Sequence, residues 1–125
     1  MKLSEIKDIL KAKVITGDDK MDLEVLYGAA SDLMSDLLVV PRQDVVLLTG
    51  LTSVQVIKSS VIAGVSAVVL VRAKSATEDM IKYAQKHDLP LLSTPFTMFT
   101  TCGRLLMKGL KGVELKEAEL KSRSA

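Results

Sequence analysis

Hydroxyl-bearing side chains follow an apolar segment near the middle of this 125-residue chain, at the point where a helical pattern begins. The apolar run at residues 45–48 passes directly into the small polar turn at residues 49–52, and helical spacing starts at Ser53. A run this short and this apolar predicts a strand buried on both faces, as in a parallel sheet covered by helices. The turn after such a strand lies at the carboxyl edge of the sheet, where α/β proteins bind ligands. These residues therefore suit the binding of a phosphate-bearing or otherwise polar small molecule.

Three further turns of this kind are expected at the same edge, at residues 30–32, 72–75 and 93–95. Each of them leads into a helix N-terminus, whose unpaired N–H groups and partial positive charge suit an anion. The predicted ligand-binding residues are Ser31, Asp32, Thr49, Gly50, Thr52, Arg72, Ser93 and Thr94, with Lys74 as an alternative charge partner. The same Ser and Thr residues are also the usual N-caps of helices, so a purely structural interpretation stays open beside the binding one.

The other polar candidates favour structural roles. Asp32 and Asp36 share a helix face and could hold a hard cation such as Mg²⁺, but a capped helix start followed by a solvated acid is the simpler interpretation. His87, the single histidine, lies at a predicted helix C-terminus, where a cation is stabilising. Cys102 has no histidine near it in sequence, which favours an inert thiol over a nucleophile.

Motifs that would mark an enzyme are absent from the sequence. There is no phosphate loop, no dinucleotide-binding fingerprint, no nucleophile elbow and no Cys-x-x-Cys spacing. The sequence therefore predicts a protein that is not an enzyme, with no catalytic residues, no metal and no cofactor.

The composition argues against several classes of function. A net charge of +2 and an aromatic content of 3% do not suit a surface for nucleic acid or for anionic membranes. A single cysteine cannot form an internal disulfide, and the first residues lack the apolar region of a signal peptide. No apolar run approaches the roughly 18 residues needed to cross a bilayer. We therefore expect a cytoplasmic protein.

The apolar pattern predicts an α/β fold. Helices are expected at residues 4–11, 31–38, 53–63, 78–87 and 96–108, and strands at residues 14–15, 24–30, 45–48, 67–71 and 89–93. The regular alternation from residue 24 onward indicates a mostly parallel central sheet of four to five strands. The last helix is expected to begin at Thr94 and Pro95 and to bury its apolar residues, which are Phe96, Phe99, Leu105 and Leu106. Residues 1–110 should form one domain, and the charged residues 111–125 a tail or loose helix.

Several segments, taken in order, resemble the DRTGG domain family. They are residues 27–36, 48–52 and 91–99 with Gly103-Arg104-Leu105, and the resemblance extends over residues 3–108. The literal Asp-Arg-Thr-Gly-Gly string is absent, and Thr49-Gly50 is its nearest counterpart. The resemblance implies a three-layer α/β/α domain, similar to the amino-terminal domain of HPr kinase. It also implies a regulatory or dimerising module without catalytic residues of its own.

Three hypotheses about function follow. The first is a non-catalytic regulatory module that homodimerises and binds a small anionic, nucleotide-like ligand at the carboxyl edge of the sheet. Stand-alone proteins that resemble this chain tend to be encoded near iron-only hydrogenases and sensor kinases, which implies the second hypothesis, an accessory protein that docks onto such a system without a ligand. The third is a small nucleotide-using transferase or hydrolase. We favour the first.

Overall fold

The structure is a computed structural model that describes residues 1–31 and 44–113. Within these ranges it contains one six-stranded sheet with the order β1-β5-β4-β3-β2-β6. The strands are β1 (Lys13–Thr16), β2 (Tyr27–Ala30), β3 (Val45–Thr49), β4 (Ala67–Leu70), β5 (Leu91–Ser93) and β6 (Lys111–Gly112). β1 runs antiparallel to β5, and the other neighbouring strands are parallel.

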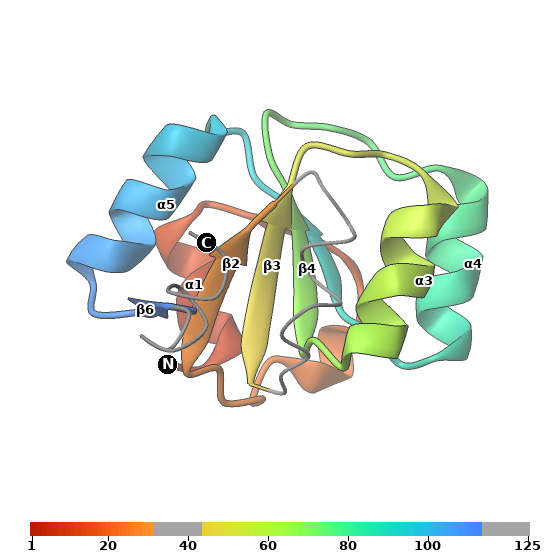
Figure 1. Cartoon of the computed structure of the whole chain (residues 1–125), viewed down its shortest axis with the longest axis horizontal. Coiled ribbons are helices and arrows are strands. Elements are labelled where there is room, and N and C mark those ends of the chain that lie inside the picture. Colours follow the sequence, from red (N-terminus) through yellow and green to blue (C-terminus); the bar gives the residue numbers. More distant parts are fainter. Residues whose placement is uncertain (32–43, 114–125) are drawn as a thin grey trace, which may run out of the picture.

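Helices cover both faces of this sheet (Figure 1). α3 (Val54–Ala63) and α4 (Glu78–Lys86) lie on one face, whereas α1 (Leu3–Ile9) and α5 (Met98–Met107) lie on the other. A 3₁₀ turn, η1 (Asp18–Lys20), follows β1. The arrangement is a three-layer α/β/α fold with a mostly parallel sheet. The expected fold class is confirmed, and the sheet has one strand more than the largest number expected.

The burial of the central strand β3 explains why residues 45–48 are all apolar. All five of its residues are buried. Because successive side chains of a strand point to opposite faces, Val45 and Leu47 pack in the core under α3 and α4. Val46 and Leu48 pack in the second core, under α1 and α5. A strand with two buried faces has no position at which a polar side chain could reach water.

Two helix ends have the caps that their residue types favour. Thr77 caps α4, and its Oγ1 accepts a hydrogen bond from the backbone N–H of Met80 at 3.2 Å. Gly64 ends α3 in the left-handed conformation, with φ of 79°. Its N–H donates to carbonyls of the last turn of that helix, as expected for a glycine C-cap.

The predicted start of the last helix is wrong. Its N-cap is Thr97, which accepts a hydrogen bond from the N–H of Thr100, and α5 begins at Met98. Thr94 is fully buried instead, and its N–H donates to Leu70 O while its carbonyl accepts from the N–H of Ala73. These bonds continue the β5–β4 pairing, so the backbone of Thr94 is not available to open a helix.

The side of α5 that is buried also differs from the prediction. Thr101 and Leu105, four residues apart, face the core, whereas Phe99 is 90% exposed and Leu106 is 67% exposed. The expectation that Phe99 and Leu106 would be buried is therefore wrong. On α3, the apolar residue Ile62 is 71% exposed. Both helices carry apolar residues on more than one side, so spacing alone does not identify the buried side.

The edge of the sheet near β2 also differs from the sequence prediction. The strand expected from residue 24 begins at Tyr27, and Leu26 just before it is 49% exposed. Lys111 and Gly112, just beyond the predicted domain boundary at residue 110, pair with Tyr27 and Gly28. That boundary stays a prediction. The helix expected at residues 31–38 and the tail from residue 114 lie outside the described residues.

None of the helices in residues 1–31 and 44–113 has the length and the apolar character that crossing a membrane requires.

Candidate functional site

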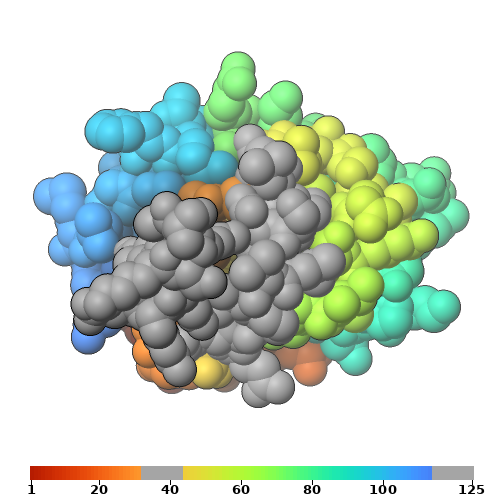
Figure 2. Space-filling view, viewed as in Figure 1, coloured from red at the N-terminus to blue at the C-terminus, as the bar shows by residue number. Residues whose placement is uncertain are grey.

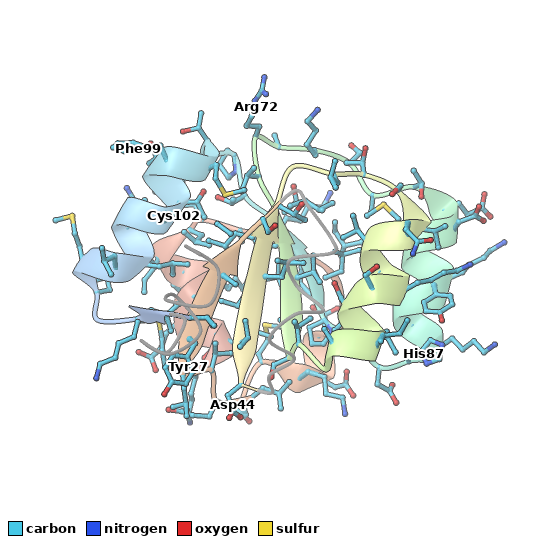
Figure 3. The ribbon with its side chains drawn as sticks, in the orientation of Figure 1. Tyr27, Asp44, Arg72, His87, Phe99 and Cys102 are labelled. Atoms are coloured by element: carbon cyan, nitrogen blue, oxygen red, sulfur yellow. The ribbon has the colours of Figure 1, made fainter. Side chains whose placement is uncertain are left out.

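The carboxyl ends of β2, β3, β4 and β5 lie at one edge of the sheet, the upper edge in Figure 1, because these four strands are parallel. The predicted site residues within the described ranges follow these strand ends. They are Ser31, Thr49, Gly50, Thr52, Arg72, Ser93 and Thr94. Arg72 projects from this edge (Figure 3), and Asp32 lies outside the described residues.

Three of the predicted hydroxyl groups have structural partners. Thr49 is buried, and its Oγ1 accepts from the N–H of Leu51 at 3.2 Å. Ser93 Oγ donates to the carbonyl of Lys74 at 2.9 Å. Thr94 Oγ1 donates to the carbonyl of Leu10 at 2.6 Å. These hydrogen bonds fix the turns at the edge, but none of them caps a helix, because the N-caps of α3 and α5 are Ser53 and Thr97. The helix-cap interpretation is therefore wrong for Thr49, Ser93 and Thr94.

A cavity of about 510 Å³ opens at this edge beside β5 and β1. We call it the lysine cavity, and it is lined by Lys11, Lys13, Val14, Ile15, Ala73, Lys74, Ser75, Ala76, Ile81, Ser93 and Pro95. Of the predicted site residues that the structure describes, only Ser93 lines it, together with the alternative charge partner Lys74. Thr49, Gly50 and Thr52 do not line it, so the structure separates the expected edge into two parts.

The lining of the lysine cavity suits an anion with an apolar portion. Lys11, Lys13 and Lys74 are exposed and carry three positive charges, and none of the lining residues is acidic. Lysine ammonium groups act as point charges toward phosphate. Val14, Ile15 and Ile81 supply an apolar wall that could receive a planar or aliphatic group. The hydroxyl of Ser75 adds a hydrogen-bonding group.

Unusual backbone conformations gather at this cavity. Lys11 has φ of 48°, and the consecutive residues Arg72 and Ala73 have φ of 62° and 55°. Such left-handed conformations are costly for residues other than glycine, and they occur most often at ligand sites. The loop is held in this shape because the N–H of Arg72 donates to Phe96 O and that of Ala73 donates to Thr94 O, both at 2.7 Å.

The end of α1, which precedes Lys11, is tied to the segment that follows β5. The carbonyl of Leu10 accepts from Thr94 Oγ1, and the carbonyl of Ile9 accepts from Arg104 Nε at 2.9 Å. The guanidinium of Arg104 also stacks on the ring of Phe96, with its carbon 4.4 Å from the ring centre. The segments that carry the three lysines are therefore positioned before any ligand arrives.

Sequence reasoning identified two of the loops that line this cavity but missed Lys11 and Lys13. These lysines flank the start of β1, which pairs antiparallel with β5. Because of that direction, the amino end of β1 lies at the carboxyl edge of the parallel strands. Two lysines around a short strand are a weak signal by themselves, and only the strand order places them at the site.

Two other reactive side chains, His87 and Cys102, do not line the lysine cavity. His87 is exposed, and its ring lies 4.4 Å from that of Tyr83. Burial raises the pKa of Cys102, so the neutral thiol is favoured. No group of three or more His, Cys, Asp or Glu side chains within residues 1–31 and 44–113 could hold a metal ion. The Asp32 and Asp36 pair lies outside those ranges.

Comparison with known proteins gives a similarity in fold to solved structures. No protein-family model and no curated protein matches the chain. Among solved structures, the chain is similar to the CBS and DRTGG domains of the regulatory region of a Clostridium perfringens pyrophosphatase, complexed with the activator diadenosine tetraphosphate. The TM-score is 0.73 at 18% sequence identity, over 93% of this chain and 51% of that chain. The chain spans about half the length of that structure, and it has a DRTGG-like fold.

Proposed function

We propose that this chain is a non-catalytic regulatory domain that binds a small anionic, nucleotide-like ligand at the carboxyl edge of its sheet and forms a homodimer. The observation that carries the proposal is the lysine cavity, where three cations and an apolar wall lie side by side. The similar pyrophosphatase region is regulatory and was crystallised with a nucleotide activator, which supports a regulatory role here. A cytoplasmic location is part of the same proposal.

In this proposal Lys11, Lys13 and Lys74 hold phosphate groups, and the base or another apolar part lies against Ile15 and Ile81. The lysines are exposed, so each ion pair contributes only about 0.2–1 kcal/mol. Removing all three therefore costs up to about 3 kcal/mol and should weaken binding by up to about 150-fold.

The remaining predicted residues frame this site. Arg72 adjoins the cavity on the loop that follows β4 and offers a further cation toward a phosphate. The turn at residues 49–52 and Ser31 form the neighbouring part of the same edge, and we keep them as predicted binding residues.

The proposal of a non-catalytic role rests on how the reactive groups are used. The hydroxyls of Thr49, Ser93 and Thr94 are engaged in hydrogen bonds that hold loops. The Cys102 thiol is kept neutral because burial raises its pKa. Among the described residues that line the lysine cavity there is no His, Cys, Asp or Glu to activate the Ser75 hydroxyl, so the hypothesis of a small transferase or hydrolase gains no support there.

A thermal-shift screen of the purified chain tests the proposal, with adenine and guanine nucleotides, dinucleoside polyphosphates, sugar nucleotides and acyl phosphates as ligands. A ligand at about 100 times its dissociation constant should add about 2.7 kcal/mol to the free energy of unfolding. In a domain of this size that corresponds to a rise in Tm of about 10 °C.

A matched pair of triple variants locates the site. Lys11→Met, Lys13→Met and Lys74→Met together should abolish most of the shift. The control changes three exposed lysines that line none of the described cavities, Lys82, Lys86 and Lys108, and it alters the net charge equally. An equal shift in both variants, or no shift with any ligand, would contradict the proposal.

The accessory-protein hypothesis has a specific observation in its favour, the exposed apolar side of α5. In that case the chain would dock onto an iron-only hydrogenase or a sensor kinase. Affinity purification from an anaerobic host would recover such a partner with the wild-type chain and lose it with Phe99→Asp. Recovery of the same partner with both chains would argue against docking through α5.

A further inference from the structure

The outer side of α5 carries large apolar side chains that no described residue covers. Phe99, Leu106 and Met107 are 90%, 67% and 88% exposed. They are seven and eight residues apart, so they lie on one side of a helix with 3.6 residues per turn. Figure 3 shows Phe99 pointing away from the sheet, and Figure 2 shows α5 at the surface. Contiguous apolar surface of this kind marks an interaction site more often than single exposed residues do.

An apolar groove of about 260 Å³ lies between α5 and the edge of the sheet. It is lined by Gly28, Ala29, Ala30, Leu48, Cys102, Leu105, Leu106, Leu110, Lys111 and Gly112. Leu106 belongs both to this lining and to the exposed side of α5, so the groove and the exposed residues form one surface. We call this surface the α5 face. It offers a protruding ring, Phe99, and a hollow about two helical turns away.

Gly103 lies midway between Phe99 and Met107 on the same helix. A Cβ added at Gly103 would meet no other atom within 4 Å, so the space beside it is open. Small residues let two helices approach each other closely. A second helix could therefore cross α5 at Gly103 and reach the side chains on either side.

We propose that a second copy of this chain packs on the α5 face, with the two α5 helices antiparallel about a two-fold axis near Cys102 and Gly103. In this arrangement Phe99 contacts the partner subunit's Leu106 and Met107 and enters the groove beside them. The contact is isologous, because each copy offers one protruding ring and one hollow. The inference rests on the homodimer of the proposed function and adds the surface that forms it.

The charges around the α5 face favour an antiparallel second copy. Lys108 and Lys111 lie beyond the C-terminal end of the apolar residues, and residues 97–100 at the other end are uncharged. An antiparallel pair sets each of these lysines against the uncharged end, whereas a parallel pair would set lysine against lysine. The positive charge of Arg104 lies to one side of the apolar residues, because its guanidinium stacks on the ring of Phe96.

The area that a dimer needs also indicates that the groove takes part. A stable dimer buries about 800 Å² on each partner. One aromatic side chain such as Phe99 supplies about 150–250 Å² of this. Leu106, Met107 and the lining of the groove must supply most of the remainder, so the helix alone is too small a contact.

Light scattering coupled to size-exclusion chromatography tests the surface with the full chain. The wild type should run as a dimer at tens of micromolar, and Phe99→Asp should weaken dimerisation by roughly 30-fold or more, as expected for an anchor residue at an interface. The control is Ile62→Asp, which places the same charge at an exposed apolar residue of α3 and should leave the dimer intact. A monomeric wild type would overturn the homodimer itself, whereas a dimer that survives Phe99→Asp would overturn only the surface.

A cross-link tests the position of the axis independently of stability. In a Cys102→Ser background, Gly103→Cys should form a disulfide between two copies under mild oxidation, because a cysteine near a two-fold axis meets its own counterpart. Ile62→Cys in the same background should stay unlinked. Equal cross-linking at both positions would contradict the proposed axis.

Discussion

The lysine cavity and the α5 face are both open to solvent, but they are built in different ways. The cavity is assembled from segments far apart in sequence, and hydrogen bonds from Thr94 and Arg104 hold those segments together. The α5 face consists mainly of one helix and the groove beside it. The comparison indicates that the cavity depends on tertiary anchoring, whereas the α5 face depends on which side of a helix is turned outward. Substitutions should therefore separate the two.

The largest effect is expected from a substitution in the core, which supports both the lysine cavity and the α5 face. Leu47→Ala in β3 truncates a fully buried side chain between the two helices of one core, and it should lower the free energy of unfolding by about 2–5 kcal/mol. Urea denaturation measures the change. Leu51→Ala, at a partly exposed position, should cost far less, and equal losses would contradict the assignment of the core.

The second-largest effect is expected in the lysine cavity, whereas the α5 face should stay unchanged. Thr94→Val keeps the shape of the side chain but leaves the Leu10 carbonyl without its buried donor, at a cost of about 1–3 kcal/mol. The end of α1 should loosen, and ligand binding should weaken with it. Dimerisation should not change when light scattering measures it under conditions in which the variant stays folded. If the variant lost its dimer but still bound the ligand, Thr94 would support the α5 face and not the lysine cavity.

A smaller effect reports on the α5 face alone. Cys102 lines the groove, and burial raises its pKa, so alkylation by iodoacetamide at pH 8 should be slower than in the unfolded chain. Because the raised pKa favours the protonated thiol in the folded state, any stability it contributes is lost as pH rises through the folded pKa. Phe99→Asp should speed alkylation several-fold by opening the groove, and mass spectrometry measures the rate. An unchanged rate in a monomeric variant would show that Phe99 does not cover the groove.

The smallest expected effect is a control for Thr94. Thr101 is also buried, but its Oγ1 has no hydrogen-bond partner. Thr101→Val removes an unsatisfied hydroxyl, so the free energy of unfolding should stay the same or rise by up to about 1 kcal/mol. Thermal denaturation of both Thr→Val variants gives the comparison. If Thr101→Val lowered the free energy of unfolding as much as Thr94→Val, the hydrogen bonds of the two hydroxyls would not explain their contributions to stability.

The fold could be predicted because its signals are local. The uninterrupted apolar run of β3 indicates two buried faces, and Thr77 and Gly64 mark helix ends through contacts within one helix. The start of α5 could not be predicted in this way. Thr94 and Thr97 are both suitable caps, and the backbone bonds from Thr94 to Leu70 and Ala73 decide between them. Those bonds join segments that are far apart in sequence.

The candidate site was predictable in part for the same reason. Lys74 and Ser93 follow parallel strands, so the edge that carries them can be inferred from alternation of strands and helices. Lys11 and Lys13 reach this edge because β1 is antiparallel, which is a property of strand order. Phe99 looked like a core residue because α5 is apolar on two sides. Phe99 and Leu105 are six residues apart and lie on different sides of α5, and Leu105 is the one that packs in the core.

The most direct test of nucleotide binding in the lysine cavity is an NMR titration of the ¹⁵N-labelled chain with diadenosine tetraphosphate. Amide shifts report which residues a ligand meets, without reference to activity. If the account is correct, the largest changes occur at Lys11, Lys13, Ala73, Lys74 and Ser93, and they disappear in the triple Lys→Met variant. Changes that centre on α5, or no saturable change at millimolar ligand, would contradict a nucleotide-binding lysine cavity.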